Sequence, residues 1–126
     1  MIASKYPINS ELLTMVVFVT RKVKRGVAEV STVTIPQYRV LVSLQKAGGA
    51  KQTKDIAEDL GITSGTVAAT TARLQENGMI ERHDDENDRR VVHVSLTEKG
   101  RRCIEEVDSV IDNLVAELWK PLGRTL

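Results

Sequence analysis

Two helical patterns joined by a tight turn, within residues 53–78, constrain the fold of this 126-residue chain more than any other feature. In the first pattern Ile56 and Leu60 are apolar at helical spacing, and Ala57 is small where two helices would cross closely. Gly61 falls four residues after Ala57, where a tight turn between helices needs a residue that tolerates positive φ. The spacing predicts a helix-turn-helix.

The second helical pattern follows Ile62. Thr63 or Ser64 can cap its first turn, and Asn77-Gly78 provides a stop signal at its end. Four residues are expected on its inner side: Val67, Thr70, Thr71 and Leu74. The residues left facing outward are Thr66, Ala68, Ala69, Ala72 and Arg73.

Two short segments with the character of β-strands follow directly, at residues 79–83 and 91–96. A polar connection from Asp84 to Arg90 separates them. This order predicts a β-hairpin. A helix-turn-helix that is followed at once by a hairpin is a winged helix.

One further helix is predicted before this unit. Thr34 and Gln37 have the spacing of a capping box, and Pro36 lies in the first turn, where its missing N–H costs nothing. The helix is expected to end before Gly48, because glycine readily adopts the positive φ of a helix stop. The winged helix-turn-helix core therefore spans residues 34–96.

Long helices are predicted on both sides of this core, at residues 9–31 and 97–120. The first has an apolar stripe wider than one face, and such a helix needs cover from two directions. The second has apolar residues at alternating steps of three and four, the spacing of a two-helix seam, and Pro121 with Gly123 ends it. We expect both to form a dimer interface, although packing on each other within one chain would produce the same pattern. The fold class is thus mainly α with a small β-hairpin, in a single domain over residues 1–126.

The overall composition bounds the class of protein. Eighteen Lys plus Arg against 17 Asp plus Glu give a net charge of +1, so the total charge does not indicate a nucleic-acid partner. No apolar run approaches the ~20 residues of a membrane span, and the amino end lacks the features of a secretory signal. The single cysteine, Cys103, excludes an internal disulfide; we expect it to be buried, with redox sensing as the alternative. These features predict a cytoplasmic protein without a membrane partner.

Residues 88–100 carry the most specific motif. It consists of Asp88, Arg90, Val94, Leu96, Thr97 and Gly100. This order is similar to the wing signature of the multiple antibiotic resistance regulator (MarR) family, Asp-x-Arg and then Val-x-Leu-Thr. Further similarity lies at Gln37-Tyr38, at Ile56-Ala57 and over residues 74–82. The chain therefore resembles a MarR-family winged helix-turn-helix regulator over about residues 34–102. It departs from many members at Glu86, where they have proline, and in the plain outward face of its recognition helix.

The resemblance implies a sequence-specific transcriptional regulator that binds double-stranded DNA. It implies a repressor that acts as a homodimer on an inverted-repeat operator and is released by a small-molecule effector. In a helix-turn-helix, the amino-terminal part of the second helix enters the major groove. We therefore expect recognition-helix contacts from Thr63, Ser64, Gly65, Thr66, Ala69 and Arg73. Arg73 could reach either a phosphate or a guanine.

The wing is expected to supply further DNA contacts through Asp88, Arg89 and Arg90. The resemblance implies that Arg90 enters the minor groove and that Asp88 holds nearby arginine side chains in position. A narrow A·T-rich minor groove has the negative potential that attracts arginine. Arg89 would contact a phosphate or Asp88. The resemblance also implies an effector pocket, for which the candidate lining residues are Met15, Phe18 and Tyr38, although core packing is the simpler interpretation of each.

A different class of function is compatible with the same residues. Near-zero net charge and the plain helix face permit a winged-helix protein-interaction module that does not bind DNA. An enzyme is not expected, because the chain has no Ser/His/acid, Cys/His or phosphate-loop constellation. No cofactor or metal site is expected either, since His83 and His93 have no Cys or third His at metal-ligand spacing.

Overall fold

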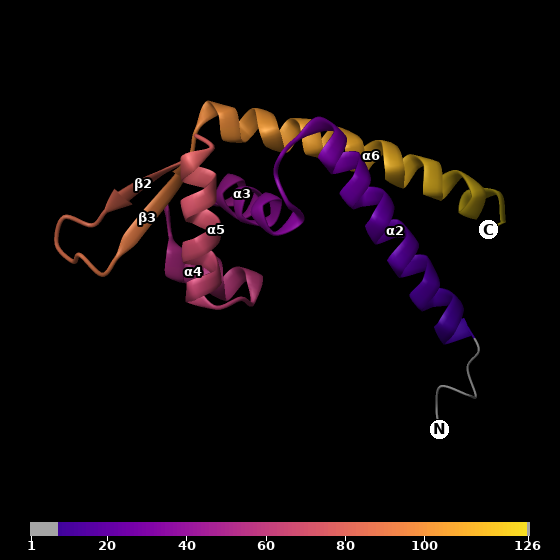
Figure 1. The fold of residues 1–126 in the computed structure, drawn as a ribbon, viewed down its shortest axis with the longest axis horizontal. Coiled ribbons are helices and arrows are strands. Elements are labelled where there is room, and N and C mark those ends of the chain that lie inside the picture. The colour runs from indigo at the N-terminus through magenta and orange to yellow at the C-terminus, as the bar shows by residue number, and fades with distance from the viewer. Residues whose placement is uncertain (1–7, 126) are drawn as a thin grey trace, which may run out of the picture.

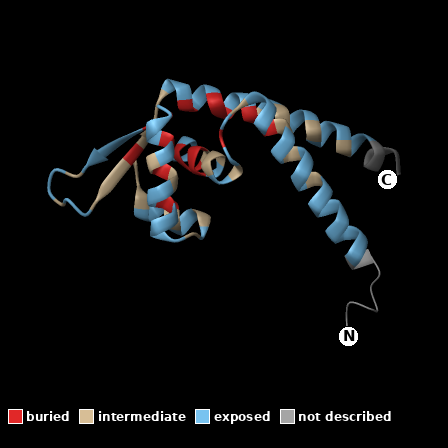
Figure 2. Cartoon of the chain, in the orientation of Figure 1, coloured by how far each residue is buried: buried red, intermediate tan, exposed pale blue. Residues whose placement is uncertain are grey.

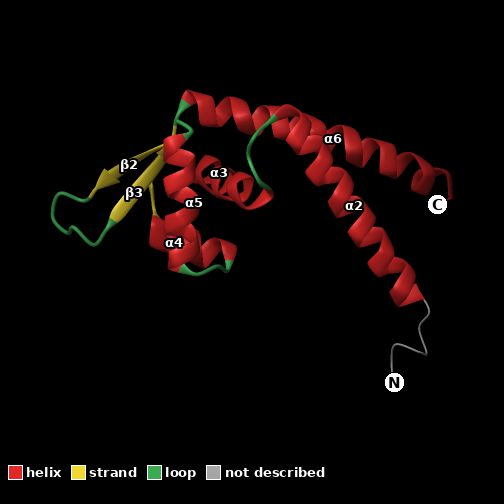
Figure 3. Cartoon of the chain, in the orientation of Figure 1, coloured by secondary structure: helices red, strands yellow, loops and turns green. Residues whose placement is uncertain are grey.

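The computed structural model describes residues 8–125. Its elements follow the chain in the order α2 (Ile8–Val30), α3 (Ile35–Ala47), β1 (Lys51–Gln52), α4 (Thr53–Leu60), α5 (Ser64–Glu76), β2 (Ile80–Asp84), β3 (Val92–Leu96) and α6 (Glu98–Thr125). Helices make up most of the chain, and β2 and β3 project from one end as a hairpin (Figure 3). The predicted fold class, a mainly α winged helix-turn-helix, is confirmed.

The elements gather into two parts (Figure 1). Helices α3, α4 and α5 lie at one end together with the hairpin, whereas α2 and α6 extend away from them. α6 begins directly after β3, and its middle contacts the carboxyl-terminal part of α2. The amino-terminal half of α2 diverges from α6. The chain therefore consists of a winged core with two long helices leaving one side.

Side-chain caps explain where the helices begin. The Thr34 side chain accepts a hydrogen bond from the Gln37 backbone N–H at 3.3 Å, and the Gln37 side chain accepts one from the Thr34 N–H at 3.1 Å. This is the predicted capping box at the start of α3. At the start of α6, the Thr97 hydroxyl accepts from the Gly100 N–H at 3.2 Å. These bonds satisfy N–H groups that have no partner within the helix.

The sheet contains one more strand than the sequence predicts. β1 pairs antiparallel with β3, which in turn pairs with β2, so that the order is β1-β3-β2. Lys51 lies opposite Val94 in the first pair, and Ile80 lies opposite Leu96 in the second. A strand of two residues is too short to show a period-2 pattern. It forms because β3 offers it a free edge.

The last helix extends further than the sequence predicts. The sequence predicts that Pro121 ends it at residue 120, whereas α6 continues to Thr125. Proline lacks one N–H donor and crowds the carbonyl four residues before it, but the residues that follow can still adopt helical dihedral angles. A proline near the end of a long helix therefore need not stop it.

The core is centred on α3. The buried apolar residues of the core are Val27, Val33, Val40, Leu41, Leu44, Ile56, Val67, Leu74, Met79, Ile80, Val94, Cys103, Ile104 and Val107. They come from every helix and from β2 and β3, and they tie α2 and α6 to the winged core through Val27 and Val107. Cys103 is buried, as expected, with its sulfur 3.4 Å from the Ser31 hydroxyl.

Much of α2 is uncovered, as Figure 2 shows along its length. The large apolar side chains that are exposed on α2 and α6 are Leu12, Leu13, Met15, Val16, Val17, Phe18, Val30, Val115 and Trp119. Leu13 is 65% exposed and Trp119 is 62% exposed. Packing within the chain therefore accounts for the stripe near Val27 but not for the amino-terminal half of α2. Within residues 8–125, no helix combines the length and apolar character needed to cross a membrane.

Candidate nucleic-acid interface

The turn between α4 and α5 sets the angle of the second helix. Gly61 has φ of 65°, in the left-handed region that glycine adopts without steric cost. The Ile62 N–H then donates to the Ala57 carbonyl oxygen at 3.1 Å, which closes the end of α4. The sequence prediction for this turn is confirmed. It places the amino-terminal end of α5 at the surface.

The orientation of α5 about its axis is fixed by burial on one side. Val67, Thr71 and Leu74 are fully buried, and the Thr71 hydroxyl donates to the Val67 carbonyl oxygen at 2.8 Å, so that this polar group is satisfied. Thr70, which was expected on the inner side with these residues, is only half-buried. The opposite face is therefore held toward solvent as a rigid surface.

That outward face holds the recognition-helix residues named from the sequence. Thr63, Ser64, Gly65, Thr66, Ala69 and Arg73 are all exposed. Of the two candidate caps, Thr63 fills the position: its hydroxyl oxygen accepts from the Thr66 N–H at 3.2 Å. The Thr66 hydroxyl lies 2.9 Å from the same oxygen. Arg73 has a guanidinium nitrogen 3.9 Å from a carboxylate oxygen of Glu76.

The wing loop holds one arginine beside one aspartate. A carboxylate oxygen of Asp88 accepts from the Arg90 backbone N–H at 3.0 Å and from the Arg90 Nε at 3.2 Å. The other Asp88 oxygen accepts from Arg90 Nη2 at 3.4 Å. The Arg90 side chain is nonetheless 90% exposed. Arg89 beside it is exposed as well. The loop therefore positions a cation without burying it.

A second aspartate shapes the other side of the loop. Asp85 accepts a hydrogen bond from the Asn87 N–H at 2.8 Å, and its other oxygen lies 3.4 Å from Nε2 of His93. The Asn87 N–H, followed by the His93 side chain, lowers the pKa of Asp85 below its ordinary value. His83 lies opposite His93 in the strand register, but its Nε2 faces the Ser95 hydroxyl at 3.4 Å. The two imidazoles therefore have different partners.

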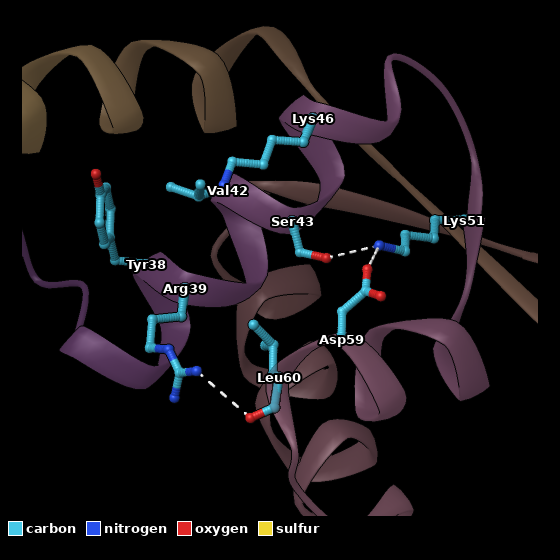
Figure 4. Close-up of a pocket in the computed structure, with 8 residues that line it drawn as sticks. All are labelled: Tyr38, Arg39, Val42, Ser43, Lys46, Lys51, Asp59 and Leu60. Carbon is cyan, nitrogen blue, oxygen red and sulfur yellow. Dashed lines mark hydrogen bonds and ion pairs between the residues drawn. The ribbon is translucent and has the colours of Figure 1, made fainter.

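The residues proposed for an effector pocket do not come together in the described chain. Tyr38 lines a hollow of about 460 Å³ on the face of α3 (Figure 4), formed by Tyr38, Arg39, Val42, Ser43, Lys46, Lys51, Asp59 and Leu60. Phe18 lies on α2 and lines a separate, smaller hollow of about 350 Å³. Met15 is exposed on the same helix. Only Tyr38 therefore belongs to the cavity beside the winged core.

The hollow at Tyr38 contains polar groups that the sequence does not single out. Lys51 Nζ contacts the Asp59 carboxylate and donates to the Ser43 hydroxyl at 2.9 Å (Figure 4). Arg39 donates to the Leu60 carbonyl oxygen at 3.4 Å. Lys51 and Asp59 lie on different elements, so no helical or strand spacing relates them. Only their three-dimensional placement shows the ion pair.

Comparison with known proteins gives concordant matches. The model of the MarR family matches residues 33–92. The transcriptional repressor MprA from Escherichia coli (strain K12) is 34% identical over 74 residues, which are 59% of this chain and 42% of that protein. The chain thus matches less than half the length of this curated relative.

Two solved structures extend the likeness over nearly the whole chain. The YusO protein from Bacillus subtilis superposes with a TM-score of 0.77 at 27% identity, covering 90% of this chain and 79% of the other. A mutant of MepR from S. aureus, bound to an oligodeoxyribonucleotide, superposes with a TM-score of 0.71 at 25% identity, covering 89% and 82%. The helix-turn-helix, the wing motif and these matches agree: residues 33–92, which form most of the winged core, match the MarR family.

Proposed function

We propose that this chain is a sequence-specific transcriptional regulator that binds double-stranded DNA. The observation that carries the proposal is the wing, where Arg90 exposes 90% of its side chain while Asp88 holds its backbone and its guanidinium. An arginine that is already positioned loses less rotamer freedom when it binds. A narrow minor groove provides the negative potential that such an exposed cation fits.

The recognition helix complements the wing. The exposed first turns of α5 lie at the same end of the molecule as the hairpin (Figure 1), so one duplex can meet both. The MepR neighbour bound to an oligodeoxyribonucleotide supports DNA as the partner, and the name of MprA supports repression. The match to a family of transcriptional regulators favours a regulator over an enzyme. A regulator of this kind acts on the genome, and we place it in the cytoplasm.

The protein acts as a homodimer in this proposal. The uncovered apolar residues of α2, with Val115 and Trp119 of α6, form a stripe that a second copy would cover. A two-fold axis through that interface relates the two recognition helices by a half-turn rotation. Such a pair fits an inverted-repeat operator whose half-sites lie about one helical turn apart.

The test begins with selection of a duplex from random DNA by the purified protein. Titration of the selected duplex at two salt concentrations should show specific binding that weakens steeply with salt, by about 0.9 in log-log slope for each neutralised phosphate. Arg90→Ala should lower the affinity. Arg102→Ala, which removes an exposed arginine from α6, is the matched control and should bind like the unaltered protein. Failure to select any duplex, with tight and salt-insensitive binding to another protein, would favour a protein-interaction module.

We further propose that a small-molecule effector binds in the hollow at Tyr38. Arg39 and Lys46 line it along α3 together with the apolar side chains of Val42 and Leu60, which favours a ligand with an apolar body and a negative charge. A ligand releases DNA only to the extent that it prefers a different separation of the two winged cores. Small aromatic carboxylates should raise the melting temperature of the protein, and Lys46→Ala should reduce that rise. If none of these compounds changed the melting temperature, the proposal that the hollow binds a negatively charged effector would be contradicted.

A further inference from the structure

The outward face of α5 is made almost entirely of small side chains. Thr66, Ala69 and Arg73 share one line along the helix, because residues three and four apart lie on the same face. Gly65 and Ala72 flank that line. The long polar side chains on this line are Arg73 and Glu76, which lie beyond the first two turns with a guanidinium nitrogen 3.9 Å from a carboxylate oxygen. The first two turns therefore present little that can reach far into a groove.

The threonine hydroxyl groups at Thr63, Thr66 and Thr70 already have partners inside the protein. Thr66 Oγ1 lies 2.9 Å from Thr63 Oγ1, which also accepts from the Thr66 N–H. Thr70 Oγ1 donates to the Thr66 carbonyl oxygen at 2.8 Å. With these hydroxyls engaged, the threonines contribute methyl groups to the surface beside the methyl groups of the alanines.

A methyl-rich surface matches one feature of the major groove. Each base pair presents a distinct pattern of donors and acceptors there, and thymine alone adds a C5-methyl group. Small side chains let the helix approach closely enough for contact with that methyl group. The β-carbons of Thr66 and Ala69 are about 5–6 Å apart, as residues three apart on a helix are, so they can contact neighbouring steps of the duplex.

We propose that α5 distinguishes bases chiefly by contact of Thr66 and Ala69 with thymine methyl groups. This inference rests on the proposed DNA binding and specifies how the sequence is read. It assigns Arg73 to a phosphate, since a phosphate contact positions the protein without reading a base. The wing then supplies affinity and a preference for narrow A·T-rich minor grooves.

The experiment replaces thymines in the selected duplex, one position at a time, by deoxyuridine, which lacks only the methyl group. At one or two positions in each half-site the affinity should fall about fourfold for each lost contact, because burial of one such carbon is worth ~0.8 kcal/mol and 1.4 kcal/mol is tenfold. Replacement of guanine by 7-deazaguanine, which lacks the N7 acceptor, should change the affinity little.

Two variants at Thr66 separate its methyl group from its hydroxyl group. Thr66→Ser keeps the hydroxyl and should abolish the effect of deoxyuridine at one position. Thr66→Val keeps a methyl group and should preserve that effect. At the other position, Ala69→Gly should abolish the effect, whereas Ala68→Gly, which has the same cost in helix propensity but lies off the line, should preserve it.

The outcomes distinguish this inference from the proposed function. If the protein selects a duplex and binds it specifically, yet no deoxyuridine position weakens binding, thymine reading is overturned while DNA binding stands. A larger loss with 7-deazaguanine would overturn it too, in favour of guanine reading by Arg73. If no duplex is selected at all, the proposed function itself fails.

Discussion

Tyr38 and Asp108 form a hydrogen bond that joins the winged core to the last helix. The Tyr38 hydroxyl, on α3, donates to the Asp108 carboxylate, on α6, across 70 residues of sequence. Burial, the hydrogen bond to Asp108 and the nearby charges of Asp108 and Asp112 together raise the pKa of Tyr38 to about 12. The bond ties the part that carries α5 to the part that carries the exposed apolar stripe.

Stability should therefore fall at alkaline pH. The unfolded chain loses the Tyr38 proton near pH 10, whereas the folded protein retains it until about pH 12. The contribution of this bond is fully present below pH 10 and is lost as the pH rises through 12. Urea unfolding below pH 10 and between pH 10 and 12 measures the difference. Tyr38→Phe should show a flatter profile over that window, and an unchanged profile would show that Tyr38 titrates alike in both states.

The pairing of Asp88 with Arg90 predicts the direction in which Asp88→Ala changes the affinity for DNA. Removing a negative charge near DNA ordinarily strengthens binding, and Glu86→Ala, in the same loop, should do so slightly. Asp88→Ala should weaken binding instead, because Arg90 loses both its backbone and its side-chain partner. In the Arg90→Ala background, Asp88→Ala should cause no further loss. Stronger binding by Asp88→Ala alone would mean that this carboxylate mainly repels DNA.

Gly100 should be essential to the junction between the hairpin and α6. A β-carbon at this position would lie 2.2 Å from the carbonyl oxygen of Met79, which accepts the Thr97 N–H at 3.1 Å. The Met79 backbone cannot move aside as the end of a flexible side chain can. Gly100→Ala should therefore lower the free energy of unfolding by about 2–3 kcal/mol. Gly49→Ala is the control, since a β-carbon there meets nothing within 4 Å. Chemical denaturation of both variants measures the difference.

The sequence predicts those parts of the fold whose signals are local. Gly61 at the turn, the Thr34–Gln37 capping box and the two strand segments after Gly78 each depend on signals within a few residues, and each is found as predicted. The parts that were missed depend on distant partners. β1 exists because β3 offers an edge, and the bond of Tyr38 to Asp108 requires α3 and α6 to meet.

The same distinction applies to the site. The exposure of α5 and of Arg90 follows from helical spacing and from a short loop, so the sequence could place both. The three proposed effector residues could not be placed in that way, because α2 leaves the core at an angle that helical periodicity does not encode. Lys51 and Asp59 look like solvated charges in the sequence and are an ion pair in the structure.

At the crossing of α2 and α6, the effect of Gly26→Ala on the free energy of unfolding should change sign when Val110 is also replaced by alanine. Alanine is favoured over glycine within a helix by ~1 kcal/mol, so Gly26→Ala alone would be expected to stabilise α2. A β-carbon at Gly26 would, however, lie 2.7 Å from Cγ1 of Val110 on α6. Valine in a helix is confined largely to one rotamer and cannot turn that methyl group away. Gly26→Ala should therefore destabilise the protein by about 1 kcal/mol or more.

In the Val110→Ala background this methyl group is gone, and the next atom, Cδ1 of Leu114, lies at an ordinary contact distance of 3.5 Å. Gly26→Ala should then stabilise the protein, because only the gain in helix propensity remains. A double-mutant cycle of unfolding free energies measures both signs in one experiment. If Gly26→Ala destabilised the protein equally in both backgrounds, the close approach would not be the reason for glycine at this crossing, and the two helices would have to meet elsewhere.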